Sequence, residues 1–257
     1  MKKIIAILIV FIFSSSSFAQ DPSFGPEFRK HRFGLKGSPG VSYFGVNKPG
    51  KNNKGLGYHI GGGITYEYSF SKNVAFGTGL KMSQTTARVE YTDSVGLNYV
   101  SVENGRSSDE RAYRLKSRNY VFNSIDIPLV LKFRTPEIGY MTYYGEFGMT
   151  ANIIHKSYAR KNLVNQIQGT SESLLSGNEK TIDTNNETHF FRGGVNFGGG
   201  VEWNIAGNTS LLFGINGNLA FTNILKKNST SITYDDGQSF VRATNLNYIG
   251  LQVGVLF

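Results

Sequence analysis

The sequence IGLQVGVLF, residues 249–257, decides how the rest of this chain is interpreted. Its large apolar side chains alternate with Gly250, Gln252 and Gly254, and this is the period of a β-strand, not of a helix. A strand with one face in water usually carries Lys, Glu or Thr there, because glycine packs against nothing and costs backbone entropy. A continuous apolar face opposite glycine and glutamine instead fits a narrow barrel with lipid outside and a crowded interior.

Earlier segments of the chain show the same alternation. They span residues 32–43, 58–70, 74–83, 121–134, 141–153, 191–205 and 211–222. Each is long enough for the roughly 9 to 11 residues that a tilted transmembrane strand needs. With the segment at 249–257, the chain is expected to form about eight strands.

The connections between these segments alternate in length. The long ones cover residues 47–57, 92–118, 156–188 and 226–242, and the short ones cover 71–73, 135–137 and 207–208. An even number of strands puts the short turns in the periplasm and the long loops outside the cell. A soluble secreted barrel is the alternative, but it has no reason to sort its connections in this way. The pattern predicts an all-β fold, a transmembrane antiparallel up-and-down β-barrel.

The N-terminal residues have the pattern of a secretory signal peptide. Lys2 and Lys3 precede an apolar run at 4–13, and small residues then lead to Ala19, where we expect cleavage. A membrane anchor would need a longer apolar run. We therefore expect a signal peptide at 1–19, a periplasmic lead-in at 20–31 and an outer-membrane β-barrel domain at 32–257. No later run of about 18 apolar residues occurs, which excludes a helical membrane protein.

The cysteine content and the net charge limit the kinds of anchor and binding partner that we expect. The chain has no cysteine, which excludes a lipoprotein anchor, disulfides and thiolate metal sites. The formal net charge is +9, and without Lys2 and Lys3 the remaining 25 Lys and Arg against 18 Asp and Glu leave +7. The basic residues do not cluster with aromatic residues on one face, so we expect no nucleic acid partner. Anionic lipid head groups, including lipopolysaccharide, are the expected counterpart.

One segment and the C-terminal residue carry a family resemblance. The sequence IDIPLVLKF at 125–133, the glycine-rich strands and Phe257 together resemble the porin-like, PorT-type family of outer-membrane β-barrel domains. The resemblance implies residence in the cell outer membrane of a Gram-negative cell envelope and insertion by the barrel-assembly machinery, which reads a terminal aromatic residue. Some relatives take part in type IX secretion, so the resemblance also allows membership of an envelope or secretion complex.

Charged residues occupy several inward positions of the expected barrel. They are Glu67, Lys81, Asp126, Lys132, Glu146, Arg192 and Glu202. Counted from the short turns, Glu67, Lys132 and Glu202 share a low height. Lys81, Asp126 and Glu146 lie a few residues higher, and Arg192 lies nearer the outer mouth. Because eight strands enclose just enough space for side chains, we expect a lumen plugged by an ion-pair network. A proton or ion path is the functional alternative.

The strongest catalytic candidate is His155 with Ser157, two residues apart and therefore expected on one face of a strand. The pair is loosely similar to the base and nucleophile of outer-membrane lipid A deacylases, but no acidic residue is placed to orient His155. The acidic stretches 183–187 and 235–237 do not follow the spacing of a calcium loop. Residues 198–200 are three glycines inside a strand, not a phosphate-binding loop. We therefore expect no catalytic residues, no metal and no cofactor.

These observations favour a barrel with a structural or surface-binding role, exerted through its extracellular loops. Lys48, Lys51 and Lys54 in the first long loop are candidates for contact with lipopolysaccharide phosphates. One alternative is a component of an outer-membrane transport or type IX secretion assembly. A further alternative is a lipid A-modifying enzyme.

Overall fold

The structure, a computed structural model, describes most of the expected barrel. The described residues are 29–45, 51–53, 55–91, 95–103, 106–166, 172–174, 181–207, 209–226, 233–234 and 244–257. The expected signal peptide, most of the lead-in, Lys48, Lys54 and the acidic stretch 235–237 lie outside the described residues. Lys51 begins a short strand, and its side chain is also outside the description.

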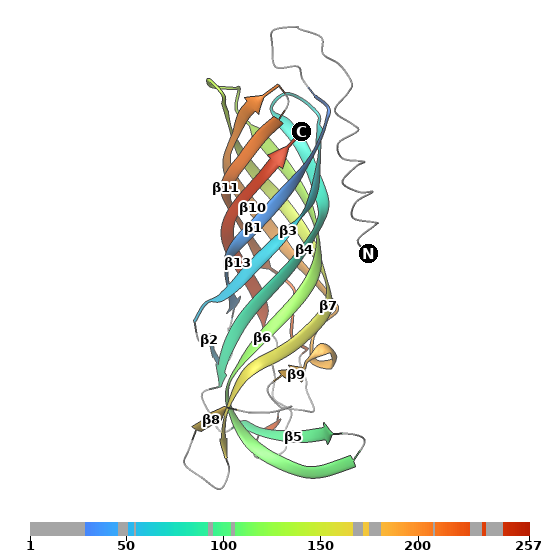
Figure 1. The fold of residues 1–257 in the computed structure, drawn as a ribbon, viewed down its shortest axis with the longest axis vertical. Helices are drawn as coiled ribbons and strands as arrows, with labels where there is room; N and C mark the ends of the chain where they lie inside the picture. Colours follow the sequence, from blue (N-terminus) through green and yellow to red (C-terminus); the bar gives the residue numbers. More distant parts are fainter. Residues whose placement is uncertain are drawn as a thin grey trace.

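Eight long strands form the wall of a closed barrel (Figure 1). They are β1 (His31–Gly45), β3 (Gly57–Ser69), β4 (Val74–Tyr91), β6 (Arg106–Arg134), β7 (Met141–Gln166), β10 (Phe191–Ala206), β11 (Thr209–Ala220) and β13 (Asn245–Leu256). Each strand pairs antiparallel with the next, and β1 pairs with β13 to complete the cylinder. The expected up-and-down antiparallel barrel is therefore confirmed.

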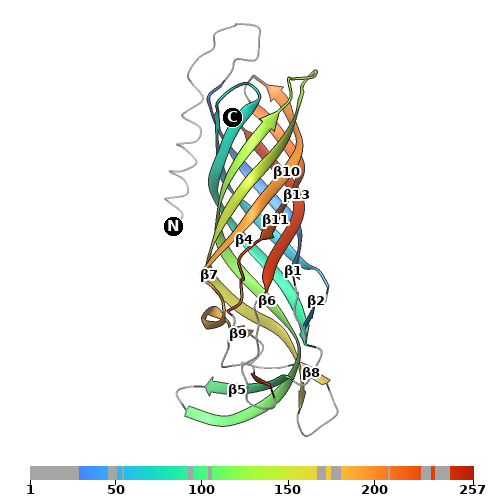
Figure 2. The same cartoon turned by 180° about the vertical axis from the view of Figure 1, so that it is seen from behind.

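The barrel closes on backbone hydrogen bonds between Phe33 and Phe257. The Phe257 N–H donates to the Phe33 carbonyl at 2.7 Å, and the Phe33 N–H donates to the Phe257 carbonyl at 3.3 Å. Closure leaves no free edge along the wall, which a membrane requires of a sheet because lipid cannot satisfy unpaired backbone groups. Figure 2 shows the same ribbon from behind, with β7, β10, β11 and β13 side by side.

The two ends of the barrel differ. The C-terminus and the short turns after β3, β6 and β10 lie at one end, which we call the turn end (Figure 1). The opposite end, the loop end, carries β2 (Lys51–Asn53), β5 (Val95–Glu103), β8 (Glu172–Leu174), β9 (Thr181–Asp183), β12 (Thr233–Tyr234) and the 3₁₀ turn η3 (Asn185–Glu187). Within the described part of the chain, no helix is long and apolar enough to cross a membrane.

The expected long loops at 92–118 and 156–188 are largely strand. β6 and β7 continue to pair far beyond the apolar segment, from Arg134–Tyr144 at the turn end to Tyr113–Gln166 at the loop end. The polar composition was therefore misleading. Outside the bilayer both faces of a strand meet water or other loops, so polar side chains mark solvent there and not the end of backbone pairing.

The alternation of side chains agrees with the expected orientation. Outward residues such as Leu251 (59% exposed) and Met149 (60%) are open, whereas inward Glu67 and Leu212 are fully buried. Val121 is an exception, because it has outward parity but is only 2% exposed. It lies above the lipid-facing segment, where its ladder neighbours are Thr86 of β4 and Tyr158 of β7.

A β-bulge at His155 changes the phase of β7. Asn123 of β6 pairs with Lys156, but the next residue, Ser124, pairs with Ile154, so His155 is the extra residue of β7. Beyond this point the parity is reversed. Ser157 faces inward and is buried, whereas His155 is exposed. The expectation that His155 and Ser157 share a face was therefore wrong.

The interior of the loop end is an apolar core that the sequence pattern did not indicate. Phe44 meets Tyr120 and Phe122 edge to face, with ring centroids 5.9 and 6.2 Å away, and the Tyr120 and Phe122 rings are stacked. Ile224 and Leu225, which follow β11, are buried against the same cluster. The run 120–122 is apolar throughout because its two faces are both covered, one by this core and the other by neighbouring strands.

Candidate functional site

The lower lumen, near the turn end, holds a compact charged cluster around Lys132. Its ammonium group lies 2.9 Å from the Glu67 carboxylate and also forms an ion pair with Glu202. All three side chains are at least 95% buried. Glu67, Lys132 and Glu202 come from β3, β6 and β10, three strands that are not adjacent, so the contacts cross the lumen.

Three further cations complete this cluster and were not part of the expected network. Arg32 Nη1 lies 2.7 Å from Glu202, and Lys36 Nζ lies 3.3 Å from Glu67 and 3.7 Å from Glu146. Arg134 pairs with both Glu67 and Glu202. The signal was present, because Arg32, Lys36 and Arg134 all have inward parity. We call Lys132 and these three cations, together with Glu67, Glu146 and Glu202, the lumen charge cluster.

The charges higher in the lumen are held mainly by neutral groups. The Asp126 carboxylate accepts hydrogen bonds from Ser83 (2.6 Å), Ser124 (2.7 Å) and the Asn152 amide (2.5 Å). Arg192 donates to the Asn152 carboxamide oxygen at 2.9 and 3.0 Å, so Asn152 joins Asp126 to Arg192.

Lys81 differs from its expected place in an upper layer of ion pairs. It lies directly across from Asp126 in the β4–β6 ladder. Among the described residues, however, no ion pair within 4 Å joins Lys81 to Asp126 or Glu146. Hydroxyl and amide groups donate to the Asp126 carboxylate instead.

His59 closes the upper network toward the loop end. Its ring stacks on Tyr248, with centroids 3.8 Å apart and planes 4° from parallel, and Nδ1 lies 2.8 Å from the Thr85 hydroxyl. A histidine satisfied in this way is a packed structural group. Its position links the polar lumen to the apolar core above it.

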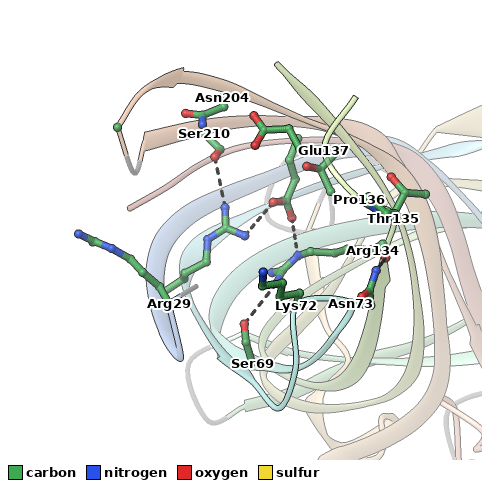
Figure 3. Close-up of a pocket in the computed structure, with 14 residues that line it drawn as sticks. Arg29, Ser69, Lys72, Asn73, Arg134, Thr135, Pro136, Glu137, Asn204 and Ser210 are labelled. Carbon is green, nitrogen blue, oxygen red and sulfur yellow. Dashed lines mark hydrogen bonds and ion pairs between the residues drawn. The ribbon is translucent and has the colours of Figure 1, made fainter. Parts of the chain in front are cut away.

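A pocket of about 470 Å³ opens at the turn end, below the lumen charge cluster. Figure 3 shows Arg29, Lys72, Arg134 and Glu137 around it, with Ser69 accepting a hydrogen bond from Arg134 at 3.3 Å. Arg29 and Lys72 are exposed, whereas the Arg134 guanidinium is already paired inside the barrel. The pocket is therefore a charged vestibule at the turn end, and the lumen charge cluster forms its inner wall.

The structure does not assemble a catalytic site from His155 and Ser157. The Ser157 hydroxyl bonds to Thr184 at 2.6 Å and to Thr188 at 2.8 Å, inside the wall, while His155 is exposed on the outside. The base is therefore not within reach of the expected nucleophile. The described residues contain no group of three His, Cys, Asp or Glu side chains arranged to hold a metal. Asp183 accepts a hydrogen bond from the Asn185 N–H at 2.8 Å, as in an ordinary turn.

A closed antiparallel barrel with apolar side chains outside and charged side chains inside defines an integral β-barrel protein of the outer-membrane type. Residues 18–226 match the family described as the outer membrane protein beta-barrel domain, so this chain belongs to that family and lies in the outer membrane. The turn end then faces the periplasm, and the loop end faces outward.

Solved outer-membrane proteins are similar to this chain at low identity. OprG from Pseudomonas aeruginosa is 13% identical, with 90% of this chain and 98% of that chain covered and a TM-score of 0.44. Neisserial surface protein A is 10% identical, with 87% and 95% covered and a TM-score of 0.41. Ail, the attachment invasion locus protein of Yersinia pestis, is 11% identical, with 89% and 100% covered and a TM-score of 0.33. No curated protein matches the chain.

Proposed function

We propose that this protein is a non-enzymatic surface-binding barrel, whose plugged lumen makes it a rigid support for the extracellular loops. The observation that carries the proposal is the succession of buried side chains along the lumen. The lumen charge cluster fills the turn end, the Asp126–Asn152–Arg192 chain fills the middle, and the apolar core around Phe122 fills the loop end. A conducting pore would instead need a continuous wet path.

Single-channel recording tests the closed lumen. The purified barrel, reconstituted in planar bilayers, is expected to give no conductance steps under an applied potential. A large porin of known conductance, inserted in the same bilayers, controls for insertion. Steady unitary conductance by this chain would overturn the plugged lumen and would favour the transport alternative.

The surface-binding part of the proposal concerns lipopolysaccharide and the first long loop. Lys48, Lys51 and Lys54 are the proposed contacts, since clustered ammonium groups form charge-assisted bonds with phosphates. The triple Lys→Gln variant is expected to bind lipopolysaccharide vesicles more weakly than the parent. Three exposed turn-end cations, Arg29, Lys30 and Lys72, provide a control with the same change of charge. Equal binding by the two variants would rule out the loop contact.

A second candidate is membership of an envelope or type IX secretion complex, as the PorT-type resemblance suggests. The charged vestibule at the periplasmic end supports it, because Arg29 and Lys72 are exposed cations at the end where a periplasmic component would meet the barrel. Co-purification from solubilised outer membranes tests this candidate. A stable partner lost in Arg29→Gln/Lys72→Gln would favour it, and recovery of the barrel alone would count against it.

A further inference from the structure

The outer wall of the barrel carries a basic patch just above its lipid-facing segment at the loop end. The bulge at His155 turns Lys156, Tyr158 and Arg160 outward, and the intervening Ser157 and Ala159 are buried. Without the bulge the two cations would point into the wall. One inserted residue therefore places two cations and a ring on the outside.

Neighbouring strands extend this patch across the wall. Three ladder rows of β4, β6 and β7, strands that lie side by side in Figure 1, make up the patch. They are Gln84–Asn123–Lys156, Thr86–Val121–Tyr158 and Arg88–Asn119–Arg160. Amide groups therefore flank the cations, and Arg88 adds a third positive charge two strands away.

Two cations of this wall patch, Lys156 and Arg160, contact the same aromatic ring. Lys156 Nζ lies 5.6 Å from the centre of the Tyr158 ring, and the Arg160 guanidinium lies 4.8 Å from the same ring. No described carboxylate lies within 4 Å of either cation. The nearest acidic residue in the ladder, Asp183 of β9, directs its carboxylate to the Asn185 N–H. Tyr158 thus holds the two cations near each other, and no carboxylate of the described residues neutralises their charges.

The height of the patch matches the outer-leaflet head groups. The row below it is Ile125–Ile153–Phe191, which is apolar, and exposed Phe190 adjoins it. Aromatic side chains of this kind mark the boundary between hydrocarbon and head groups. Lys156 lies two ladder rows beyond Ile153, because His155 is the extra residue of the bulge, and two rows are about 7 Å along the strand. A lysine this close to the apolar boundary can extend its side chain so that the ammonium group lies in the head-group region.

From this arrangement we propose a lipid A phosphate site on the barrel wall, formed by Lys156 and Arg160, with Tyr158 as the platform between them. The guanidinium and ammonium groups would bind a phosphate monoester, and the acyl chains would lie on the apolar row below. The site rests on the outer-membrane location, and it deepens the proposed lipopolysaccharide binding with a contact separate from Lys48, Lys51 and Lys54.

Binding of defined lipids to the purified full barrel in nanodiscs tests the wall site. The probes are bisphosphorylated lipid A, the same lipid with its phosphates removed, and phosphatidylglycerol. Lys156→Gln/Arg160→Gln is expected to lose roughly tenfold or more in affinity for bisphosphorylated lipid A. Lys30→Gln, an exposed cation exchanged at the opposite end, is the control and is expected to bind like the parent, and Lys156→Gln alone matches its change of charge. The heat-dependent gel shift verifies that each variant is folded.

Three outcomes would overturn the wall site. The first is equal affinity of the wall variant and its control for bisphosphorylated lipid A. The second and third are a loss of affinity of the wall variant for dephosphorylated lipid A, or for phosphatidylglycerol, as large as its loss for bisphosphorylated lipid A. Tyr158→Leu removes the platform but no charge, and is expected to lose affinity for bisphosphorylated lipid A, whereas Tyr158→Phe keeps it. The Lys48, Lys51 and Lys54 variant is measured in parallel. Its failure with the wall site intact would remove the loop contact alone.

Discussion

Lys132 Nζ lies 2.9 Å from Glu67 Oε1, and both side chains are at least 99% buried in the lower lumen. A buried ammonium group and a buried carboxylate are each costly to leave alone, so the pair matters chiefly through what its loss would expose. Around it, Arg32, Lys36 and Arg134 share the same few carboxylate oxygens. The lumen charge cluster is therefore a unit, in which the removal of one member affects all its neighbours.

The first prediction concerns Glu67→Gln. The substitution keeps the shape of the side chain but leaves several buried cations with one carboxylate fewer, so the free energy of unfolding is expected to fall by about 3 to 5 kcal/mol. Urea titration of the barrel in lipid vesicles measures it. Glu137→Gln, the same exchange at an exposed turn position, is expected to stay within about 0.5 kcal/mol of the parent. A similar stability for both variants would contradict the cluster's role.

The second prediction concerns Asn152, the bridge between Asp126 and Arg192. Asn152→Leu removes a donor from Asp126 and an acceptor from Arg192, and is expected to destabilise the barrel by about 3 kcal/mol. Asn216→Leu is the control, since Asn216 is also buried but its carboxamide oxygen accepts no hydrogen bond from the described residues. The same urea titration compares them, and a smaller effect at Asn152 would exclude the bridge.

The third prediction concerns the close approach of strands at Gly200. A Cβ at this position would lie 2.0 Å from the Phe213 carbonyl oxygen of β11, so Gly200→Ala forces the backbone to move. We expect a loss of about 1 to 3 kcal/mol, as for overpacked positions. At Gly145 nothing lies within 4 Å of the added atom, and Gly145→Ala is expected to unfold like the parent. The reverse order would show that the strands are further apart than described.

The fourth prediction concerns the two ends of the lumen. Lys132→Ala/Glu202→Ala thins the lower cluster, but the Asp126–Asn152–Arg192 chain and the apolar core at the loop end remain, so planar bilayers are expected to stay silent. Adding Asn152→Ala/Arg192→Ala removes the middle obstruction, and adding Tyr120→Ala/Phe122→Ala as well removes two large buried rings from the core, so only this last variant is expected to conduct. Conductance from the first double variant would mean that the apolar core is no barrier.

The fifth prediction concerns His155 and the enzymatic alternative. His155→Ala is expected to leave the acylation pattern of lipid A unchanged, because the ring lies outside the wall and Ser157 lies inside it. Mass spectrometry of lipid A from cells with the parent or the variant measures the pattern. An altered number of acyl chains would restore the lipid A-modifying alternative.

The sequence was sufficient for the wall of the barrel because a period of two is visible in one chain. Residues such as Leu251 and Glu67 lie on the faces that their parity indicates. The height of an inward residue along the barrel could be counted from the sequence only where a short turn joins two strands and so fixes their register. The position of Arg32 in the cluster depends on how β1 pairs with β3 and with β13. A long loop separates β1 from β3, and the pairing with β13 closes the barrel, so no local sequence pattern gives either register.

The remaining differences have equally local causes. The bulge at His155 has no sequence signature, since any residue can be the extra one in a strand, and one extra residue reverses every assignment beyond it. The core at Tyr120 and Phe122 escaped notice because a run without alternation fits several structures. Polar residues in the outer parts of β6 and β7 suggested loops, although backbone pairing continues there without apolar support.

The pairing of Phe33 with Phe257 means that the first and last strands of the wall, β1 and β13, are neighbours in the finished barrel. Before closure, the sheet therefore has two edge strands with unpaired backbone groups, and either edge could pair with a strand of another chain. Both edges are satisfied in one step, the pairing of β1 with β13. Until these two strands pair, an unclosed copy is prone to aggregation through its unpaired backbone groups.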